Sequence, residues 1–555
     1  MRTRTTRAPQ QSPETLNHPP ALEGYNAYTS DRALQDAAAR FEAGGEESLA
    51  AYGALSGDRL MVLGTQANEN RPRLRSVDRA GRRIDVVEYH PAYHELMAEA
   101  IRAGIHNGPW SENGPSHVHR AILMYLHNQA EAGTSCPLTM TFSAVPALRR
   151  QPEIAGQWLP GILSSRYDPR NRPAADKAGL TIGMAMTEKQ GGSDVRTNIT
   201  RAEAIDAPGP GQAYRLDGHK WFCSAPMSDA FLVLARTDEG PGCFLMPRWR
   251  PDGTRNGMHI QRLKDKVGNW ANASSEIELD GAWAALIGEP GRGVRTIIDM
   301  VAMTRFDCLV GSASLMRQAV AQAVHWAVHR RAFGRQLIDQ PLMRNVLADL
   351  SVESEAALLL AMRVARALDR AGDDPREARL ARLAVPLGKY WVCKRTPALV
   401  NEAQECLGGA GYVEDFLIAR LYREAPLNSI WEGSGNIQCL DILRVMDRDP
   451  ECLTVLDGEL ERAGGRSPVY DRALSQLRDQ WADADNLAFR SRYLVERLAV
   501  TFQAALLVEN DHPEVAEAFL AGRLDEQAGL AFGTLPSHIE TEAILRRARP
   551  DGPLT

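Results

Sequence analysis

The stretch SIWEGSGNIQCLDILR, residues 429–444, contains one carboxylate, Glu432, between an indole and a run of small residues. Small residues let a backbone approach a ligand closely, and the helix predicted from Asn436 onward would direct free N–H groups at an anion. An aromatic neighbour that excludes water raises the pKa of a carboxylate toward the range of a general base. The pattern therefore indicates a base beside a bound ligand, with a solvated loop charge as the simpler alternative.

Two further motifs are suited to a flat, acceptor-rich ligand. MAMTEKQGGSDV (184–195) leaves a strand-like segment and enters small residues whose N–H groups are free to bind an acceptor. GHKWFCSAP (218–226) places two aromatic residues beside a hydroxyl, which suits a planar cofactor. An ordinary turn and ordinary core aromatics are the alternative interpretations. Neither motif is the GxGxxG of a dinucleotide-binding βαβ unit.

Two motifs lie in the second half of the chain. HRRAFGRQL (329–337) contains three arginines at the end of a predicted helix, where they could hold a phosphate or complement the helix dipole. GGAGY (408–412) predicts a helix C-terminus, and also a place where backbone meets ligand.

Hydrophobic periodicity divides the chain into five regions. The pattern predicts an extended arm over residues 1–30, a helical domain over 31–180, a β-domain over 181–288, a helical bundle over 289–448 and a helical extension over 449–555. Short segments broken by Gly, Pro, Asn and Asp make the β-domain the one place where sheet is expected. The fold class is mostly α with a central β-domain.

Composition places the chain among soluble multi-domain proteins. It has 555 residues, 44% of them hydrophobic and 24% charged, and a net charge of -6, which does not suggest nucleic acid as a partner. The eight cysteines show no CxxC or Cys/His spacing, which favours reduced thiols over disulfides or a metal site. With neither a membrane-length apolar run nor a signal-peptide core, we expect a cytoplasmic protein that does not bind membranes.

Together and in this order, MTEKQGGSD, GHKWFCS, RRAFG, LGGAGY and IWEGSGNIQ resemble the acyl-CoA dehydrogenase flavoprotein family. The KQGGSD and WEGSGNIQ variants and the long C-terminal extension are most similar to its AidB branch. The resemblance covers residues 45–445 and continues more weakly to the end. It implies an N-terminal helical domain, a β-barrel-like domain and a four-helix bundle, with FAD between the last two. It also implies a homotetramer that shares FAD sites between subunits.

The resemblance assigns Glu432 the role of catalytic base. In the family, this glutamate removes the α-proton of an acyl-CoA thioester while the β-hydrogen leaves as hydride to flavin N5. Some members take the base from the first bundle helix instead, where this chain has Thr304 and Arg305. The alternative base is therefore absent.

The resemblance also assigns the residues that contact FAD. Glu405 stands where the family often has a glutamine, and Gln404 is a possible substitute. Arg330, Phe333 and the paired glycines match positions that reach the FAD of a neighbouring subunit. The complete set is Met184, Met186, Thr187, Gly192, Ser193, Phe222, Cys223, Ser224, Arg330, Phe333, Gly408, Gly409, Ile430, Trp431, Gly433, Ser434, Gly435 and Asn436.

Two alternatives to a dehydrogenase remain open. The AidB branch is associated with the response to alkylation damage and with double-stranded DNA binding through the extension, so catalysis could be minor. Residues 451–555, however, hold 11 Arg and no Lys against 18 Asp and Glu, whereas a DNA-binding face should be basic. Two local clusters of arginines remain as alternatives: Arg490, Arg492 and Arg497 on one predicted helix, and Arg546, Arg547 and Arg549 near the end. An acyl-CoA oxidase is the other alternative, because related oxidases also carry extra C-terminal helices.

Overall fold

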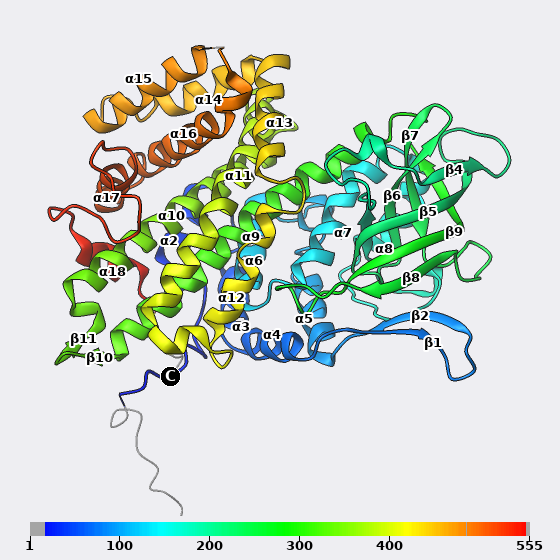
Figure 1. Cartoon of the computed structure of the whole chain (residues 1–555), viewed down its shortest axis with the longest axis horizontal. Coiled ribbons are helices and arrows are strands. Elements are labelled where there is room, and N and C mark those ends of the chain that lie inside the picture. Colours follow the sequence, from blue (N-terminus) through cyan, green and yellow to red (C-terminus); the bar gives the residue numbers. More distant parts are fainter. Residues whose placement is uncertain (1–16, 484, 551–555) are drawn as a thin grey trace, which may run out of the picture.

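The computed structural model describes residues 17–483 and 485–550, and it confirms a mostly helical chain with a central β-domain (Figure 1). Polar side chains begin several helices of the N-terminal region: Asp31 accepts a hydrogen bond from the Leu34 amide, and Ser116 accepts one from His119. These helices are α2 (Arg32–Arg40), α3 (Glu46–Ser56), α4 (Arg59–Glu69), α5 (Pro91–Arg102), α6 (His117–Ala130), α7 (Ser135–Leu148) and α8 (Pro152–Ile162).

Half of the predicted N-terminal arm packs onto the body of the protein. Residues 17–30 form turns without a helix or strand, yet Leu22, Tyr25 and Tyr28 are at most 3% exposed. The Tyr25 hydroxyl donates to Gln318 in the helical bundle at 3.0 Å. This half of the arm is therefore docked, and residues 1–16 lie outside the described residues.

The expectation that sheet is confined to residues 181–288 is wrong. β1 (Arg73–Val77) and β2 (Arg83–Glu88) form an antiparallel ribbon that reaches out beside the β-domain (Figure 1). Leu74 pairs with Val87 across the ribbon, and both pack on the β-domain core, while arginines occupy the other face. Strands this short carry too few apolar positions to stand out against the strong helical period on either side.

The β-domain closes on itself. Its strands are β3 (Ile182–Ala185), β4 (Arg201–Ala204), β5 (Ala213–Ser224), β6 (Ala230–Thr237), β7 (Gly240–Pro247), β8 (Met258–Leu263) and β9 (Ser274–Ile287). They follow the order β3-β6-β4-β5-β9-β7, and β7 pairs again with β6, so the sheet is barrel-like. β8 pairs with β9 outside this path.

Long helices form the bundle at the centre of the molecule (Figure 1). They are α9 (Gly293–His329), α10 (Pro341–Arg370) and α11 (Pro375–Cys406), followed by α12 (Leu417–Glu424) and α13 (Gly435–Arg448). A small hairpin, β10 (Arg331–Ala332) with β11 (Arg335–Gln336), follows α9 and is a second ribbon outside the β-domain. Single 3₁₀ turns are η1 (Gly108–Trp110), η2 (Ala174–Asp176), η3 (Val195–Thr197), η4 (Leu337–Asp339), η5 (Gly408–Tyr412) and η6 (Leu427–Ser429).

The C-terminal extension shares the hydrophobic core of the bundle. Its helices are α14 (Glu451–Glu461), α15 (Pro468–Ala482), α16 (Leu487–Val508), α17 (Pro513–Arg523) and α18 (Thr541–Ala548). Leu498 and Phe502 are fully buried in the same apolar cluster as α9, α10 and α11. Across the two described ranges, no helix combines the length and hydropathy that crossing a membrane requires.

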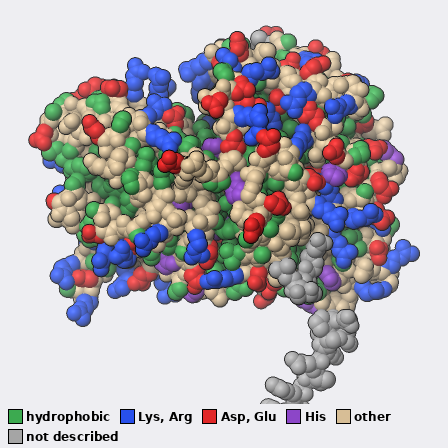
Figure 2. Space-filling model, turned by 180° about the vertical axis from the view of Figure 1, so that it is seen from behind, with side chains coloured by type: hydrophobic (Ala, Val, Ile, Leu, Met, Phe, Trp, Pro, Cys, Tyr) green, Lys and Arg blue, Asp and Glu red, His purple; other side chains and the backbone are tan. Residues whose placement is uncertain are grey.

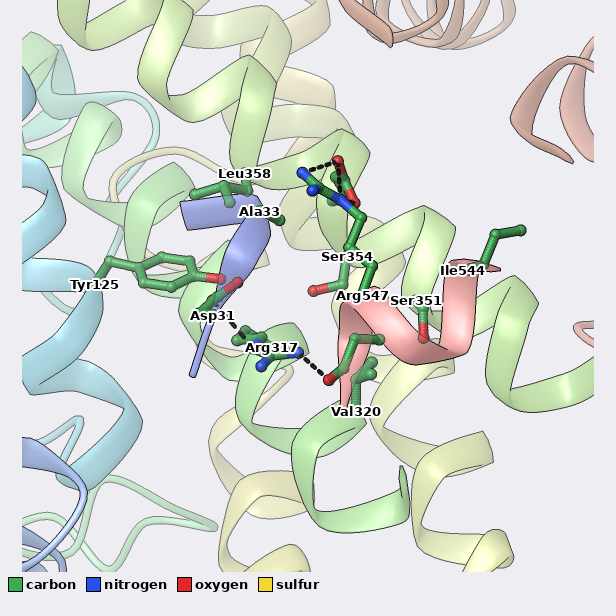
Figure 3. A pocket seen from close by; sticks show the side chains of 12 residues that line it. Asp31, Ala33, Tyr125, Arg317, Val320, Ser351, Ser354, Leu358, Ile544 and Arg547 are labelled. Atoms are coloured by element: carbon green, nitrogen blue, oxygen red, sulfur yellow. Dashed lines mark hydrogen bonds and ion pairs between the residues drawn. The ribbon is translucent and has the colours of Figure 1, made fainter. Parts of the chain in front are cut away.

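Charged side chains fix the last helix, α18, to the bundle (Figure 3). Arg547 pairs with Glu355 of α10 at 2.9 Å. Arg317 of α9 donates to the Ala548 carbonyl at 2.8 Å and pairs with Asp31 at 3.0 Å. Because both guanidinium groups are 8% exposed, these buried contacts fix α18 and Asp31, the residue before α2, to the bundle.

Candidate active site

Glu432 lies in a strained loop between η6 and α13. Its φ is +58°, in the left-handed region that costs a non-glycine residue about 1–3 kcal/mol, and Gly433 follows at +93°. The Glu432 carbonyl accepts hydrogen bonds from Arg305 Nε at 3.0 Å and Gln438 Nε2 at 3.1 Å. Lys389 Nζ, in a side chain that is almost fully buried, donates to the Trp431 carbonyl at 2.7 Å. Donors from three helices thus hold the strained backbone in place.

The Glu432 carboxylate meets the position of the alternative base. Thr304 of α9 donates its hydroxyl proton to Glu432 Oε2 at 2.6 Å. Burial raises the pKa of Glu432, while the Thr304 hydrogen bond and the charges of Lys389 and Arg305 lower it in part. Among the described residues, no group donates to Oε1. One oxygen is therefore anchored and the other remains free to accept a proton.

An ion-pair network supports this loop from behind. Arg305 Nη1 pairs with Asp441 of α13 at 2.8 Å, and Arg382 of α11 pairs with the same carboxylate at 3.0 Å. Burial alone would raise the pKa of Asp441, but its hydrogen bonds and charge contacts with Arg382 and Arg305 outweigh burial and lower it. The network joins α9, α11 and α13 beneath the Glu432 loop.

In the structure, Trp431 shares an apolar cluster with the methionines of the motif MAMTEKQGGSDV (184–195). Trp431, Met184 and Met186 pack on one apolar cluster, so the end of β3 faces the Glu432 loop. The indole Nε1 donates to Asn428 at 2.9 Å, which fixes the ring. Ile430, on the other side of Trp431, is 65% exposed and free to contact a ligand.

A buried ion pair shapes the small-residue loop after β3. Glu188 and Lys220 are both fully buried and lie 2.7 Å apart, and Glu188 also accepts the Ile199 amide at 2.7 Å. Burial would raise the pKa of Glu188, but the charge and hydrogen bond of Lys220, together with the hydrogen bonds from Thr200 and the Ile199 amide, outweigh burial and lower the pKa to about 2. The loop is also tied to β5, because the Thr187 carbonyl accepts the Trp221 amide at 2.8 Å. Gly192 and Ser193 remain exposed at its tip.

On β5, Phe222 and Ser224 share the outward face, and Cys223 does not. Phe222 is 50% exposed, and the Ser224 hydroxyl lies 2.9 Å from that of Ser274. Cys223 is fully buried in the β-domain core, where burial raises its pKa to about 12. The Cys223 thiol therefore points away from the other predicted contacts, and only its backbone remains for a ligand.

The start of α13 is suited to an anion. Ser434 occupies the N-cap but its side chain does not cap the helix, which leaves the first N–H groups of α13 to another acceptor. Arg492 of α16 reaches the Asn436 side chain at 3.5 Å. A Cβ at Gly435 would lie 3.4 Å from Lys394, so a second cation is close. These groups fit the pyrophosphate of FAD, and the exposed Phe222 fits the edge of its ring.

The remaining predicted contacts lie at the other end of the bundle. α9 has 37 residues and spans roughly 55 Å, with Gly293 packed on β7 at one end and Arg330 at the other. Phe333, at the tip of the β10–β11 hairpin, is 97% exposed with φ +50°. Gly408 and Gly409 are exposed after α11.

We call these four residues, Arg330, Phe333, Gly408 and Gly409, the far set. The near set is Glu432 with the other predicted contacts: Met184, Met186, Thr187, Gly192, Ser193, Phe222, Cys223, Ser224, Ile430, Trp431, Gly433, Ser434, Gly435 and Asn436. Gln404 donates to the Gly411 carbonyl at 2.7 Å, so its side chain is used within its own loop. Glu405 is exposed beside the paired glycines.

Sequence reasoning missed Lys389, Asp441, Glu188 and Lys220. Lys389 is the one charge in the apolar run AVPLGKYWV, and Glu188 and Lys220 each stand within a recognised motif. Their positions could have been noticed in the sequence. Their partners could not, because the paired residues lie 32 to 136 positions apart in the chain.

Comparison with known proteins agrees with this arrangement. Three family models match: the adaptive response protein AidB N-terminal domain over residues 17–169, the acyl-CoA dehydrogenase middle domain over 183–282 and the acyl-CoA dehydrogenase C-terminal domain over 291–446. The AidB protein of Escherichia coli (strain K12) is 43% identical over 97% of this chain and 98% of its own length. Acyl-CoA dehydrogenase family member 11 of Caenorhabditis elegans is 31% identical over 81% of this chain and 77% of its own.

Solved structures show the same fold. The crystal structure of Caenorhabditis elegans ACDH-11 in complex with C11-CoA superposes with a TM-score of 0.83 at 27% identity, covering 94% of both chains. The apo-form of Bd2924 gives 0.80 at 27% identity and covers 91% of this chain and 99% of that one. The chain belongs to the acyl-CoA dehydrogenase family, in its AidB branch, and is an oxidoreductase with FAD as cofactor.

Proposed function

We propose that this protein is an acyl-CoA dehydrogenase in which Glu432 removes the α-proton of an acyl thioester. The geometry of Glu432 carries the proposal: one carboxylate oxygen is anchored by Thr304 and the other is free, in a loop held by Lys389 and Arg305. A raised pKa suits a carboxylate that must accept a proton from a weak carbon acid. Bound FAD supplies the two-electron acceptor for the β-hydrogen. Trp431 helps to keep water away from the base.

An acyl-CoA thioester is the proposed substrate class. ACDH-11, which shares the fold over 94% of both chains, was crystallised with C11-CoA. Acyl-CoA dehydrogenase names recur among the relatives, including member 11 of the same worm. Free buried thiols at all eight cysteines support a reducing, cytoplasmic setting.

A complete site is proposed to need two copies of the chain. The near set and the far set lie at opposite ends of α9, and Phe333 is exposed at a hairpin tip where no described part of its own chain covers it. An exposed aromatic held in a left-handed conformation suits a contact with a neighbour. We therefore propose the homotetramer implied by the resemblance, with FAD sites shared between subunits.

A role in the response to alkylation damage is part of the proposal, supported by the likeness to AidB over nearly the whole chain. Binding of double-stranded DNA through residues 449–555 has less support. Arg490 pairs with Asp483 at 3.1 Å, and Arg547 is buried against Glu355. Such arginines are already neutralised within the protein.

The test is an anaerobic titration of the purified holoprotein with a panel of short, branched and long acyl-CoAs, followed by flavin absorbance. Wild type should bleach with at least one thioester, whereas Glu432→Gln should bind FAD normally and bleach about 10² to 10⁴ times more slowly. Equal bleaching by both proteins would remove Glu432 from the base role. Rapid reoxidation by O₂ with peroxide release would assign the protein to the acyl-CoA oxidases.

A further inference from the structure

A cavity whose lining shares no residue with the near set lies where the β1–β2 ribbon meets the β-domain. It measures about 200 Å³ and is lined by Arg83, Asp85, Arg250, Arg255, Asn256, Gly257 and His259. Three guanidinium groups against one carboxylate give the lining a charge of +2 when the histidine is neutral. Neither the sequence motifs nor the proposed reaction uses this cavity.

Asp85 organises the cations around the cavity. It is 1% exposed and adopts φ +43°, a strained conformation for a non-glycine residue. Its Oδ2 accepts Arg83 Nε at 2.8 Å, and Arg255 and His259 each lie 3.7 Å from the same oxygen. A single carboxylate thus holds three cationic or potentially cationic groups at the cavity wall.

Two buried polar atoms of the lining have no partner among the described residues. Arg250 donates from Nη2 to the Gly281 carbonyl at 3.1 Å, but its buried Nε–H finds no acceptor. Asp85 Oδ1 is buried and accepts no hydrogen bond. Because burying a donor or an acceptor without a partner is unfavourable, a ligand that offers the complementary groups would be stabilised at these two atoms.

The surrounding charge favours an anion. Residues 71–88 of the ribbon contain six Arg against three Asp and Glu. Figure 2 shows Lys and Arg side chains gathered at its lower left, where the half-turn from Figure 1 places the ribbon. Burial lowers the pKa of Arg255; the Asp85 carboxylate opposes this effect, and the Arg83 guanidinium adds to it. An anion between these guanidinium groups would relieve that crowding.

We propose that this cavity binds the phosphate monoester group of a small molecule that carries a hydroxyl next to the phosphate. The dianion of a phosphate monoester matches the +2 charge of the lining. Its oxygens accept from Arg250 Nε and from the N–H groups of Arg83 and Arg255 that are not already bonded to Asp85 and to the Ile260 and Arg83 carbonyls. The neighbouring hydroxyl donates to Asp85 Oδ1, which otherwise lacks a donor.

The test is isothermal titration calorimetry on the FAD-loaded protein at constant ionic strength, with inorganic phosphate, glycerol 3-phosphate and glycerol as probes. Both phosphates should bind and glycerol should not. Tighter binding of glycerol 3-phosphate assigns the site to phosphorylated metabolites, while equal binding assigns it to free phosphate and removes the role of Asp85 Oδ1. No heat from either phosphate up to about 10 mM would overturn the proposal.

Variants locate the binding. Arg250→Gln should weaken phosphate about 10- to 100-fold, and Arg250→Lys, which keeps the charge but lacks the Nε–H, should be intermediate. The control is Arg262→Gln, because Arg262 lies on β8 but is 63% exposed and pairs with Glu276 outside the cavity lining. Equal loss in Arg250→Gln and Arg262→Gln would overturn the proposal. The proposal would also be overturned if the protein bound blunt duplex DNA without terminal phosphates but bound neither phosphate probe.

Discussion

The near set and the far set of predicted cofactor contacts are built in opposite ways. Around Glu432, buried charges such as Lys389 and Asp441 hold the loop from below, so the near set is shaped by its own chain. At the other end of α9, Phe333 is 97% exposed, and a Cβ added at Gly409 would meet no atom of the described residues within 4 Å. The contrast teaches that the chain by itself holds the geometry around its base but leaves most of the far set exposed, which is what the proposed sharing of FAD sites requires.

The largest effect is expected from substitutions that remove side chains of the far set. Arg330→Ala with Phe333→Ala should weaken FAD binding about 10- to 100-fold, because a charge-assisted contact and an aromatic contact to the neighbour's cofactor are lost. The free energy of unfolding of the FAD-free chain should change by less than about 1.5 kcal/mol, since Phe333 is exposed and Arg330 loses one hydrogen bond, to the Asn17 carbonyl. FAD titration and thermal unfolding measure the two quantities. A destabilised chain with normal FAD affinity would contradict the comparison.

Substitutions that remove the buried support of the Glu432 loop should lower the stability of the protein. Lys389→Met leaves the Trp431 carbonyl without its donor and should lower the free energy of unfolding by about 1–3 kcal/mol. The matched control is Lys394→Met, on the same helix but exposed, which should cost less than about 0.5 kcal/mol. If denaturant unfolding shows the same loss in free energy of unfolding for both variants, Lys389 does not hold the Glu432 loop in place.

The hydrogen bond between Thr304 and Glu432 provides a second test of the near set. Thr304→Val removes a bond that lowers the pKa of Glu432, so that pKa should rise. Because the base must be deprotonated, the acid limb of kcat/KM should move to higher pH by about one unit, with little change on the plateau. Thr304→Ser, which keeps the hydroxyl, should retain the original limb. An unmoved limb in Thr304→Val would mean that Glu432 is not the titrating base.

Gly409 gives the smallest and most selective test of the far set. Its φ lies outside the left-handed region and a Cβ there meets nothing within the described part of its own chain, so Gly409→Ala should leave stability unchanged or raise it by up to about 1 kcal/mol. If its backbone lies against the FAD of a neighbour, FAD affinity should fall several-fold. Gly156→Ala, equally open but on α8, serves as the control. Loss of affinity in neither variant would take Gly409 out of the cofactor site.

The sequence predicted the fold class and the neighbourhood of Glu432 because both depend on local patterns. The helix predicted from Asn436 begins at Gly435, and position 304 was identified as the place of an alternative base. That Thr304 would instead anchor Glu432 depends on tertiary packing between α9 and the loop. The β1–β2 ribbon was missed because its strands are short, and the inward turn of Cys223 because a bulge between Lys220 and Cys223 shifts the register of β5.

The most direct test of a site shared between two copies is co-expression of two defective chains. Glu432→Gln chains keep an intact far set, and Arg330→Ala/Phe333→Ala chains keep an intact near set. With random pairing, about one quarter of the sites would combine both intact halves. At an FAD concentration too low to load the Arg330→Ala/Phe333→Ala chains, the tandem-purified mixture should therefore show acyl-CoA-dependent flavin bleaching in about a quarter of its sites. Alone, the Glu432→Gln chains hold FAD but scarcely bleach, and the Arg330→Ala/Phe333→Ala chains hold little FAD. A mixed protein as inactive as its components would contradict a site shared between two copies.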